Sequence, residues 1–186
     1  MSELRISGRR IEVLFDAEAI GRRVGELARE IGAADFENLL VVAVLKGSFI
    51  FTADLLRAMH DAELSPEVEF ISLSSYKDAT ISTGQVTILR DIESDVRGRS
   101  VLLIDDILES GRTLAHAKDL MAARGAREVR TCVLLDKPGK RVADIEADFI
   151  GFSCPDRFVV GYGMDMAHAF RELPFVGVVL TAPEAP

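Results

Sequence analysis

The stretch with the most unusual side chains is residues 101–114, VLLIDDILESGRTL. Four apolar residues lead directly into Asp105 and Asp106, and a polar segment that contains Ser110 and Gly111 follows. Carboxylates accept hydrogen bonds from hydroxyl groups and can hold a hydrated Mg²⁺. Glycine permits close backbone approach, and hydroxyls and helix N-terminal amides donate to phosphate oxygens. The segment therefore predicts a site for a ligand that carries both hydroxyls and a phosphate.

An ordinary strand-to-helix turn is the alternative explanation of this stretch. Asp and Ser are favoured helix-capping residues, so a capped turn with solvated acids would contain similar residue types. The pattern matches neither a Walker A loop nor GxGxxG, which disfavours those two classes of nucleotide-binding protein.

Apolar runs typical of strands alternate along the chain with helix-like patterns, in which apolar residues recur every three or four positions. This alternation predicts an α/β fold with a central, mostly parallel sheet flanked by helices. No linker or repeat is evident, so we expect a single domain over residues 1–186. Strands are expected at 38–45, 67–76, 86–91, 99–105 and 128–136, with shorter ones at 148–152, 157–161 and 175–180. Helices are expected after a capping Asp16, over 48–62, and with Leu114, Ala117, Leu120 and Met121 on one face.

Three chemically unusual segments each follow an expected strand: LKGS at 45–48, DDILESGRT at 105–113 and DKPGK at 136–140. Ligands of parallel α/β sheets gather at the carboxyl ends of the strands. We therefore expect these three segments to form one site.

The composition excludes several classes of protein. A net charge of −8 and the absence of Trp disfavour a broad nucleic-acid surface. The two cysteines form no CxxC pair and the three histidines lack metal-ligand spacing, so neither disulfides nor zinc are indicated. The longest aliphatic run, 39–45, is too short to span a bilayer, and the N-terminal residues lack an apolar signal core. We expect a cytoplasmic protein without a membrane or nucleic-acid partner.

The stretch 101–114 closely resembles the phosphoribosyl-diphosphate (PRPP) binding motif of type I phosphoribosyltransferases. Further segments resemble hypoxanthine-guanine phosphoribosyltransferases, and the match runs from about residue 10 to 180. These segments are VLKGSFIF (44–51), SSYKDATISTGQV (74–86), LLDKP (134–138) and PDRFVVGYGMD (155–165) followed by Phe170 and Arg171.

The resemblance implies a set of PRPP contacts. Asp105 and Asp106 would meet the ribose hydroxyls, the 109–113 loop would wrap the 5-phosphate, and Arg171 would contact pyrophosphate. A cis peptide bond between Leu45 and Lys46 would turn backbone amides toward the pyrophosphate. The PRPP-binding residues implied are Leu45, Lys46, Gly47, Asp105, Asp106, Glu109, Ser110, Gly111, Arg112, Thr113 and Arg171.

The resemblance also implies a purine pocket and a Mg²⁺ site. Lys137 would donate to the purine 6-oxo group, because lysine is a donor only, and Phe158 would stack on the base. Taken alone, Lys137 could be a surface lysine and Phe158 a core aromatic. The purine-binding residues implied are Ile107, Lys137, Phe158, Val159 and Asp165, and the Mg²⁺ ligands are Asp105, Asp106 and Asp165.

Glu109 departs from the family pattern, which usually has Asp there. That carboxylate is the expected catalytic residue and would handle the purine N7 proton. The resemblance further implies a mobile lid with Ser75 and Tyr76, a small hood from the N-terminal residues and about 150–186, and a homo-oligomer, either a dimer or a tetramer.

The activity implied is Mg²⁺-dependent transfer of phosphoribosyl from PRPP to N9 of hypoxanthine or guanine, which gives IMP or GMP plus pyrophosphate. One alternative is the uracil phosphoribosyltransferase that doubles as an RNA-binding attenuation regulator. A catalytically inactive sugar-phosphate-binding protein and a receiver-like domain are two others. The DKP and FVVGYGMD segments, LKGS, and the SGRT loop favour the purine enzyme over these.

Overall fold

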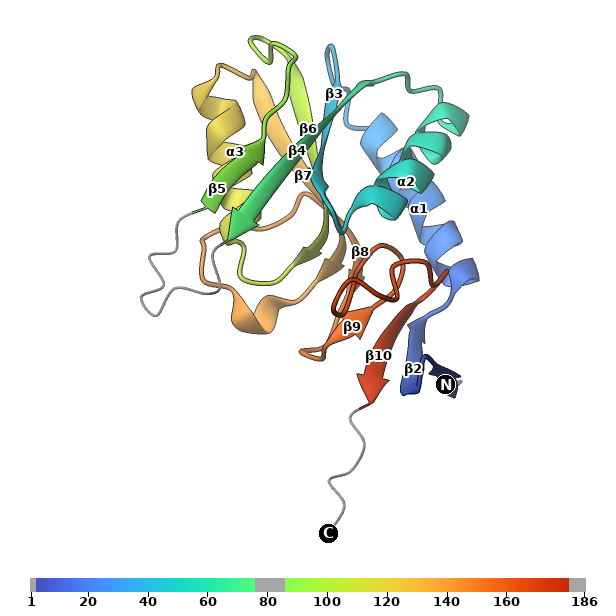
Figure 1. Cartoon of the computed structure of the whole chain (residues 1–186). Helices are drawn as coiled ribbons and strands as arrows, with labels where there is room; N and C mark the ends of the chain where they lie inside the picture. Colours follow the sequence, from blue (N-terminus) through green and yellow to red (C-terminus); the bar gives the residue numbers. More distant parts are fainter. Residues whose placement is uncertain (1–2, 76–85, 181–186) are drawn as a thin grey trace.

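The computed structural model describes residues 3–75 and 86–180, which form two β-sheets and three α-helices (Figure 1). The larger sheet has six strands in the order β5-β4-β3-β6-β7-β8. Its neighbouring strands are parallel except β4 and β5, which are antiparallel. The α/β fold with a mostly parallel sheet is therefore confirmed. Its strands are β3 (Leu40–Leu45), β4 (Glu67–Ser75), β5 (Val86–Arg90), β6 (Ser100–Leu108), β7 (Glu128–Asp136) and β8 (Phe149–Ser153).

Helices cover both faces of this sheet (Figure 1). α1 (Ala17–Gly32) and α2 (Phe49–Asp61) pack together on one face, and α3 (Arg112–Ala123) packs on the other. Asp16 caps α1 as expected, since its Oδ1 accepts a hydrogen bond from the Ala19 amide at 2.8 Å. In the described part of the chain, no helix combines the length and apolar composition of a membrane span.

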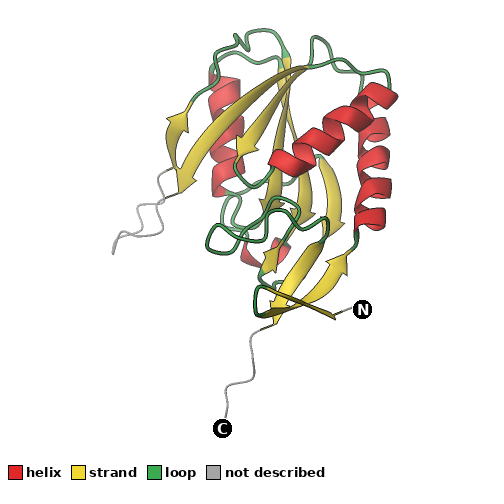
Figure 2. Ribbon diagram, turned by 45° about the vertical axis from the view of Figure 1, so that its right-hand side comes forward, coloured by secondary structure: helices red, strands yellow, loops and turns green. Residues whose placement is uncertain are grey.

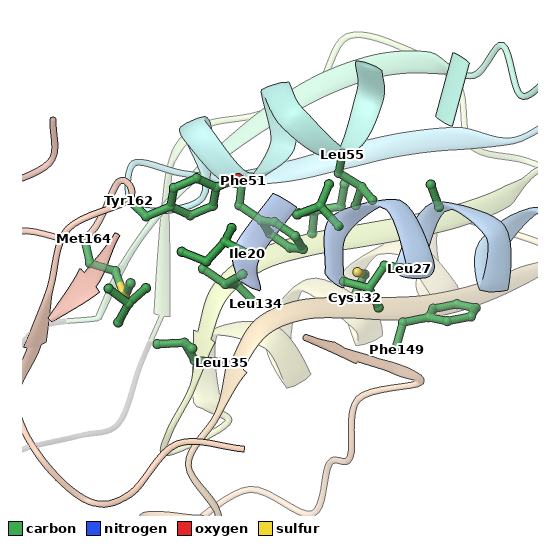
Figure 3. Close-up of a cluster of buried hydrophobic side chains, with 14 of the residues drawn as sticks. Ile20, Leu27, Phe51, Leu55, Cys132, Leu134, Leu135, Phe149, Tyr162 and Met164 are labelled. Carbon is green, nitrogen blue, oxygen red and sulfur yellow. The ribbon is translucent and has the colours of Figure 1, made fainter. Parts of the chain in front are cut away.

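Two hydrophobic cores lie on opposite faces of the sheet. Successive residues of a central strand alternate between them: Val41 and Leu102 pack with α1 and α2, whereas Val42 and Leu103 pack with α3. Both faces are therefore buried, which explains why the central strands are uninterrupted apolar runs in the sequence. Figure 3 shows part of the first core, with Ile20, Leu27, Phe51, Leu55, Cys132 and Leu134 among the labelled residues.

A smaller antiparallel sheet lies beyond the carboxyl ends of the central strands (Figures 1 and 2). It joins N-terminal residues to residues after 158, the segments from which the sequence predicts a hood, and it has a small core of its own around Ile11 and Phe170. In the order β1-β2-β10-β9, its strands are β1 (Glu3–Ile6), β2 (Arg9–Phe15), β10 (Val176–Leu180) and β9 (Val159–Val160).

The expectation that the acid-bearing strand ends at residue 105 is wrong. β6 continues to Leu108, because Ile107 and Leu108 still pair with Leu135 and Asp136 of β7. The two carboxylates are therefore held by the strand itself and not by the loop that follows it.

The expected lid falls only partly within the described residues. Ser75 is the last residue of β4, and β5 begins at Val86. Tyr76 and 77–85 lie outside the described residues.

Candidate active site

The three unusual segments meet at the carboxyl ends of β3, β6 and β7, where two cavities lie side by side. One cavity, of about 440 Å³, is lined by the acidic end of β6 and the loop that leads into α3. The other, of about 560 Å³, is lined by residues that follow β7 and by residues around β9. Leu45, Lys46, Gly47, Leu73, Asp106, Ile107 and Glu109 line both cavities. The two cavities therefore form one continuous site.

Asp105 and Asp106 form a closely coupled acidic pair. Asp105 is buried, and its Oδ1 accepts a hydrogen bond from the Asp106 backbone amide at 2.9 Å. Burial raises the pKa of Asp105 well above its usual range, and the charge of Asp106 raises it further. Burial also raises the pKa of Asp106, although hydrogen bonds and the charge of Arg171 oppose this effect. A hydroxyl donor or a cation at this position would stabilise the charged form of the pair.

The loop between β6 and α3 begins after Ile107 and Leu108, the two strand residues that follow the acidic pair. Gly111 has a φ of +79° and a Cβ there would lie 2.7 Å from Ile145 Cγ2, so this position requires glycine on both counts. The Ser110 hydroxyl accepts a hydrogen bond from the Arg112 amide at 3.4 Å. Residues 110–113 line the smaller cavity beside the N-terminus of α3, where hydroxyls and amides can meet an anion.

The loop after β3 reaches the same site. The peptide bond between Leu45 and Lys46 is cis, as the family resemblance implies. Gly47 leaves no room for a side chain, because a Cβ there would lie 1.8 Å from Asp106 Oδ2. On its other side, a Cβ on Gly163 would lie 2.1 Å from the Gly47 carbonyl oxygen. The diphosphate loop expected at 45–47 is thus in close contact with both the acidic pair and the loop that precedes Asp165.

Lys137 points into the larger cavity and pairs with the expected catalytic carboxylate. It is only 5% exposed, and its Nζ donates to Glu109 Oε1 at 3.0 Å. Lys140 Nζ lies 3.7 Å from the same oxygen and 2.8 Å from Asp156 Oδ1. Lys140 and Asp156 are not among the site residues expected from the sequence, although their positions just after Lys137 and just before Phe158 give a weak signal for them. Lys137 is therefore not a surface lysine.

The remaining predicted residues also line the larger cavity. Phe158 is 57% exposed, which excludes a core aromatic and leaves its ring open to a ligand. Val159 is buried in β9. Arg171 pairs with Asp165 at 2.7 Å, and its Nη1 donates to the Gly163 carbonyl at 2.5 Å.

Every predicted site residue that the structure fully describes lines one of the two cavities. The side chain of Ser75 and all of Tyr76 are outside what is described. Leu45, Lys46, Gly47, Asp105, Asp106, Ile107, Glu109, Ser110, Gly111, Arg112 and Thr113 line the smaller cavity, and Ile107, Lys137, Phe158, Val159, Asp165 and Arg171 line the larger.

The carboxylates fit a Mg²⁺ ion that takes most of its ligands from water and substrate. Among residues 3–75 and 86–180, no group of three or more acidic, His or Cys side chains is close enough to enclose a metal. Asp105 and Asp106 are adjacent in β6, whereas Asp165 comes from a different segment, where it pairs with Arg171. Mg²⁺ typically binds one or two carboxylates together with water and substrate phosphates. The donor set suits that mode of binding and not an all-protein cage.

Comparison with known proteins agrees with this arrangement. The family model described as "Phosphoribosyl transferase domain" matches residues 11–167. The hypoxanthine phosphoribosyltransferase of Escherichia coli (strain K12) is 40% identical over 177 residues, which are 94% of this chain and 98% of the relative. The hypoxanthine-guanine phosphoribosyltransferase of Bacillus subtilis (strain 168) is 43% identical over 173 residues, or 92% and 94% of the two chains.

A solved structure shows the same fold. The crystal structure of a hypoxanthine phosphoribosyltransferase from Staphylococcus aureus superimposes with a TM-score of 0.85 at 38% identity, covering 91% of each chain. The chain therefore belongs to the phosphoribosyltransferase family, as a member of its hypoxanthine-guanine phosphoribosyltransferases.

Proposed function

We propose that this enzyme serves purine salvage by transferring the 5-phosphoribosyl group of PRPP to N9 of hypoxanthine or guanine, with release of pyrophosphate. The products are IMP or GMP. The observation that carries the proposal is the continuity of the two cavities. The cavity lined by a hydroxyl-rich anion loop and by the acidic pair, of which Asp105 is buried, shares a wall with the cavity that contains a buried lysine and an exposed phenylalanine.

PRPP would occupy the smaller cavity. Its 5-phosphate would lie against Ser110, Gly111 and Thr113, where hydroxyls and helix amides donate hydrogen bonds. Its ribose hydroxyls would donate to Asp105 and Asp106. Its diphosphate would lie between the 45–47 loop and Arg171, which approach each other through the Gly163–Gly47 contact. These contacts orient the sugar before the glycosidic bond changes.

The purine would occupy the larger cavity between Phe158 and Lys137. The ammonium of Lys137 can only donate a hydrogen bond, so it favours a 6-oxo group and disfavours the 6-amino group of adenine. Its burial strengthens this preference, because a buried donor left without a partner is costly.

Glu109 would handle the proton at N7. The 6-oxo group and N7 are neighbours on one edge of a purine, and Glu109 Oε1 is 3.0 Å from the Lys137 ammonium. A base whose oxygen binds Lys137 therefore presents N7 near the Glu109 carboxylate. General acid–base help of this kind typically contributes about 10²–10⁴-fold.

Mg²⁺ would be held by Asp105, Asp106 and Asp165 together with oxygens of the substrates. When bound, it would neutralise charge on the departing pyrophosphate. The protein's own donors at 45–47 and Arg171 would act on the same group from the other side.

We further propose, from the family resemblance, that the chain is a single domain with a hood, that a lid at Ser75 and Tyr76 excludes water during transfer, and that the enzyme is a cytoplasmic homo-oligomer, either dimeric or tetrameric. These proposals are separate from the assignment of the reaction.

The proposal is tested by incubating the purified protein with PRPP and Mg²⁺ and following pyrophosphate release with one base at a time. We expect pyrophosphate release with hypoxanthine or guanine. Xanthine tests which substituents at purine C2 the site accepts. Adenine and uracil should give none. Release with uracil but not with the 6-oxopurines would contradict the proposal and favour a pyrimidine enzyme.

A further inference from the structure

We propose that Arg141 is a positioning residue of the phosphate site. Its guanidinium holds the loop of residues 109–111 from behind, so that the amides of the loop face the 5-phosphate. This inference rests on the proposed function, because the phosphate in question is that of PRPP.

Arg141 is bonded to four different groups around the loop. Its Nε donates to the Glu109 carbonyl at 3.2 Å, and its Nη2 donates to the Leu108 carbonyl at 3.4 Å. Its Nη1 donates to the Ile145 carbonyl at 2.5 Å, and its charge is paired with Asp136 at the end of β7. The planar guanidinium thus connects the loop, the strand β7 and the segment that follows it.

The backbone beside Arg141 completes this clamp. The amides of Val142 and Ala143 both donate to the Ser110 carbonyl, at 2.9 and 3.0 Å. The Lys137 amide donates to the Leu108 carbonyl at 2.9 Å. Three consecutive carbonyls, those of residues 108–110, therefore point toward the segment 137–143.

The direction of these carbonyls determines where the amides of the loop point. In a planar trans peptide, the carbonyl of one residue and the amide of the next point in opposite directions. The amides of residues 109–111 are therefore aimed away from 137–143, and those of Ser110 and Gly111 have no backbone acceptor within the described ranges. Ser110 and Gly111 line the smaller cavity, whereas no residue of 137–145 does. The free amides consequently face the space that a phosphate would fill.

The role of Arg141 is geometric and not a matter of attracting the phosphate by charge. Its charge is neutralised by Asp136, and its side chain is mostly buried, at 19% exposure. The loop rests directly on it, since a Cβ on Gly111 would lie 3.1 Å from Arg141 Cδ. A lysine keeps the charge but cannot reproduce the fork of donors that spans several carbonyls.

Arg99 offers a matched control for Arg141. Arg99 precedes β6 at the opposite end of the sheet, and its side chain is 10% exposed. It donates to the carbonyls of Asn38 and Leu39 at 3.2 and 3.4 Å and pairs with Glu67 at 2.7 Å. Arg99→Lys thus removes a similar set of bonds at a distance from the cavities.

The test compares Arg141→Lys with Arg99→Lys in steady-state kinetics. We expect Arg141→Lys to raise the KM for PRPP about tenfold or more, and to leave the KM for hypoxanthine within about twofold of wild type. Arg99→Lys should leave both KM values unchanged, even if both variants unfold at lower temperature. Hydrogen exchange at Val142 and Ala143, whose amides donate to the Ser110 carbonyl, should accelerate only in Arg141→Lys.

An unchanged KM for PRPP in Arg141→Lys, or an equal rise in Arg99→Lys, would overturn the inference while the transfer activity of the wild type stands. A wild-type protein without transfer activity would overturn the proposed function and this inference together.

Asp136→Asn provides a second test that keeps the arginine in place and removes only its ion-pair partner. We expect the KM for PRPP to rise about threefold, because the guanidinium is less firmly held. An unchanged KM for PRPP would mean that the ion pair does not position the loop. A lower KM would mean that the arginine attracts the phosphate by charge. Either result would overturn the geometric role.

Discussion

Replacing Gly47 by alanine tests the contact on which the diphosphate end of the site depends. The added Cβ would lie 1.8 Å from Asp106 Oδ2 and 2.4 Å from its Cγ. Real Cβ atoms essentially never approach closer than 3.0 Å, so the carboxyl group must move by about 1.2 Å. A misplacement of about 1 Å at a reacting centre can lower the rate about 100-fold. We therefore expect kcat/KM for PRPP to fall about 100-fold.

Initial rates of pyrophosphate release, measured over a range of PRPP concentrations, give this ratio directly. Gly139→Ala is the matched control, because a Cβ at Gly139 meets no atom within 4 Å and the residue lines neither cavity. Its kcat/KM should equal that of wild type. A folded Gly47→Ala protein with kcat/KM within about threefold of wild type would refute the reasoning, since it would show that the position of Asp106 is not critical.

Three further substitutions address other parts of the account. Glu109→Gln should lower kcat by about 10²–10⁴-fold and barely change the KM for PRPP; single-turnover rates would check this, and an unaltered kcat would remove Glu109 from the mechanism. Lys137→Met should lower kcat/KM for hypoxanthine by about 10- to 100-fold, because a hydrogen bond from a charged donor is lost. Initial rates over a range of hypoxanthine concentrations would check this, and a kcat/KM equal to that of wild type would contradict the assigned base contact. Tyr162→Phe removes the 2.6 Å hydrogen bond to Asp54 Oδ2 and should lower the free energy of unfolding by about 1 kcal/mol in urea titrations, whereas an unchanged midpoint would mean that the bond adds nothing to stability.

The central sheet could be predicted from the sequence because each of its buried strands is recognisable from its own residues. β3, β6 and β7 are buried on both faces, so each is a continuous apolar run in the sequence. β1 and β2 could not be predicted in this way. Charged residues interrupt both strands, Ile11 is their one fully buried hydrophobic residue, and β2 pairs with β10 from the far end of the chain.

The individual site residues could be predicted only in part. Composition alone favours Phe158 as a core residue, and only the motif around it indicated that its ring is exposed to a ligand. The acidic pair appeared to end its strand, yet pairing with β7 carries β6 three residues further. The contacts made by Lys140 and Arg141 depend on how two loops lie against each other, which no spacing in the sequence reveals.

The central claim is that the protein joins a 6-oxopurine to the ribose of PRPP, and product stoichiometry tests it most directly. With PRPP, Mg²⁺ and hypoxanthine, chromatography should show one IMP formed for each pyrophosphate released, and no release without a base. Pyrophosphate release without IMP, or formation of UMP from uracil in place of IMP, would contradict the account.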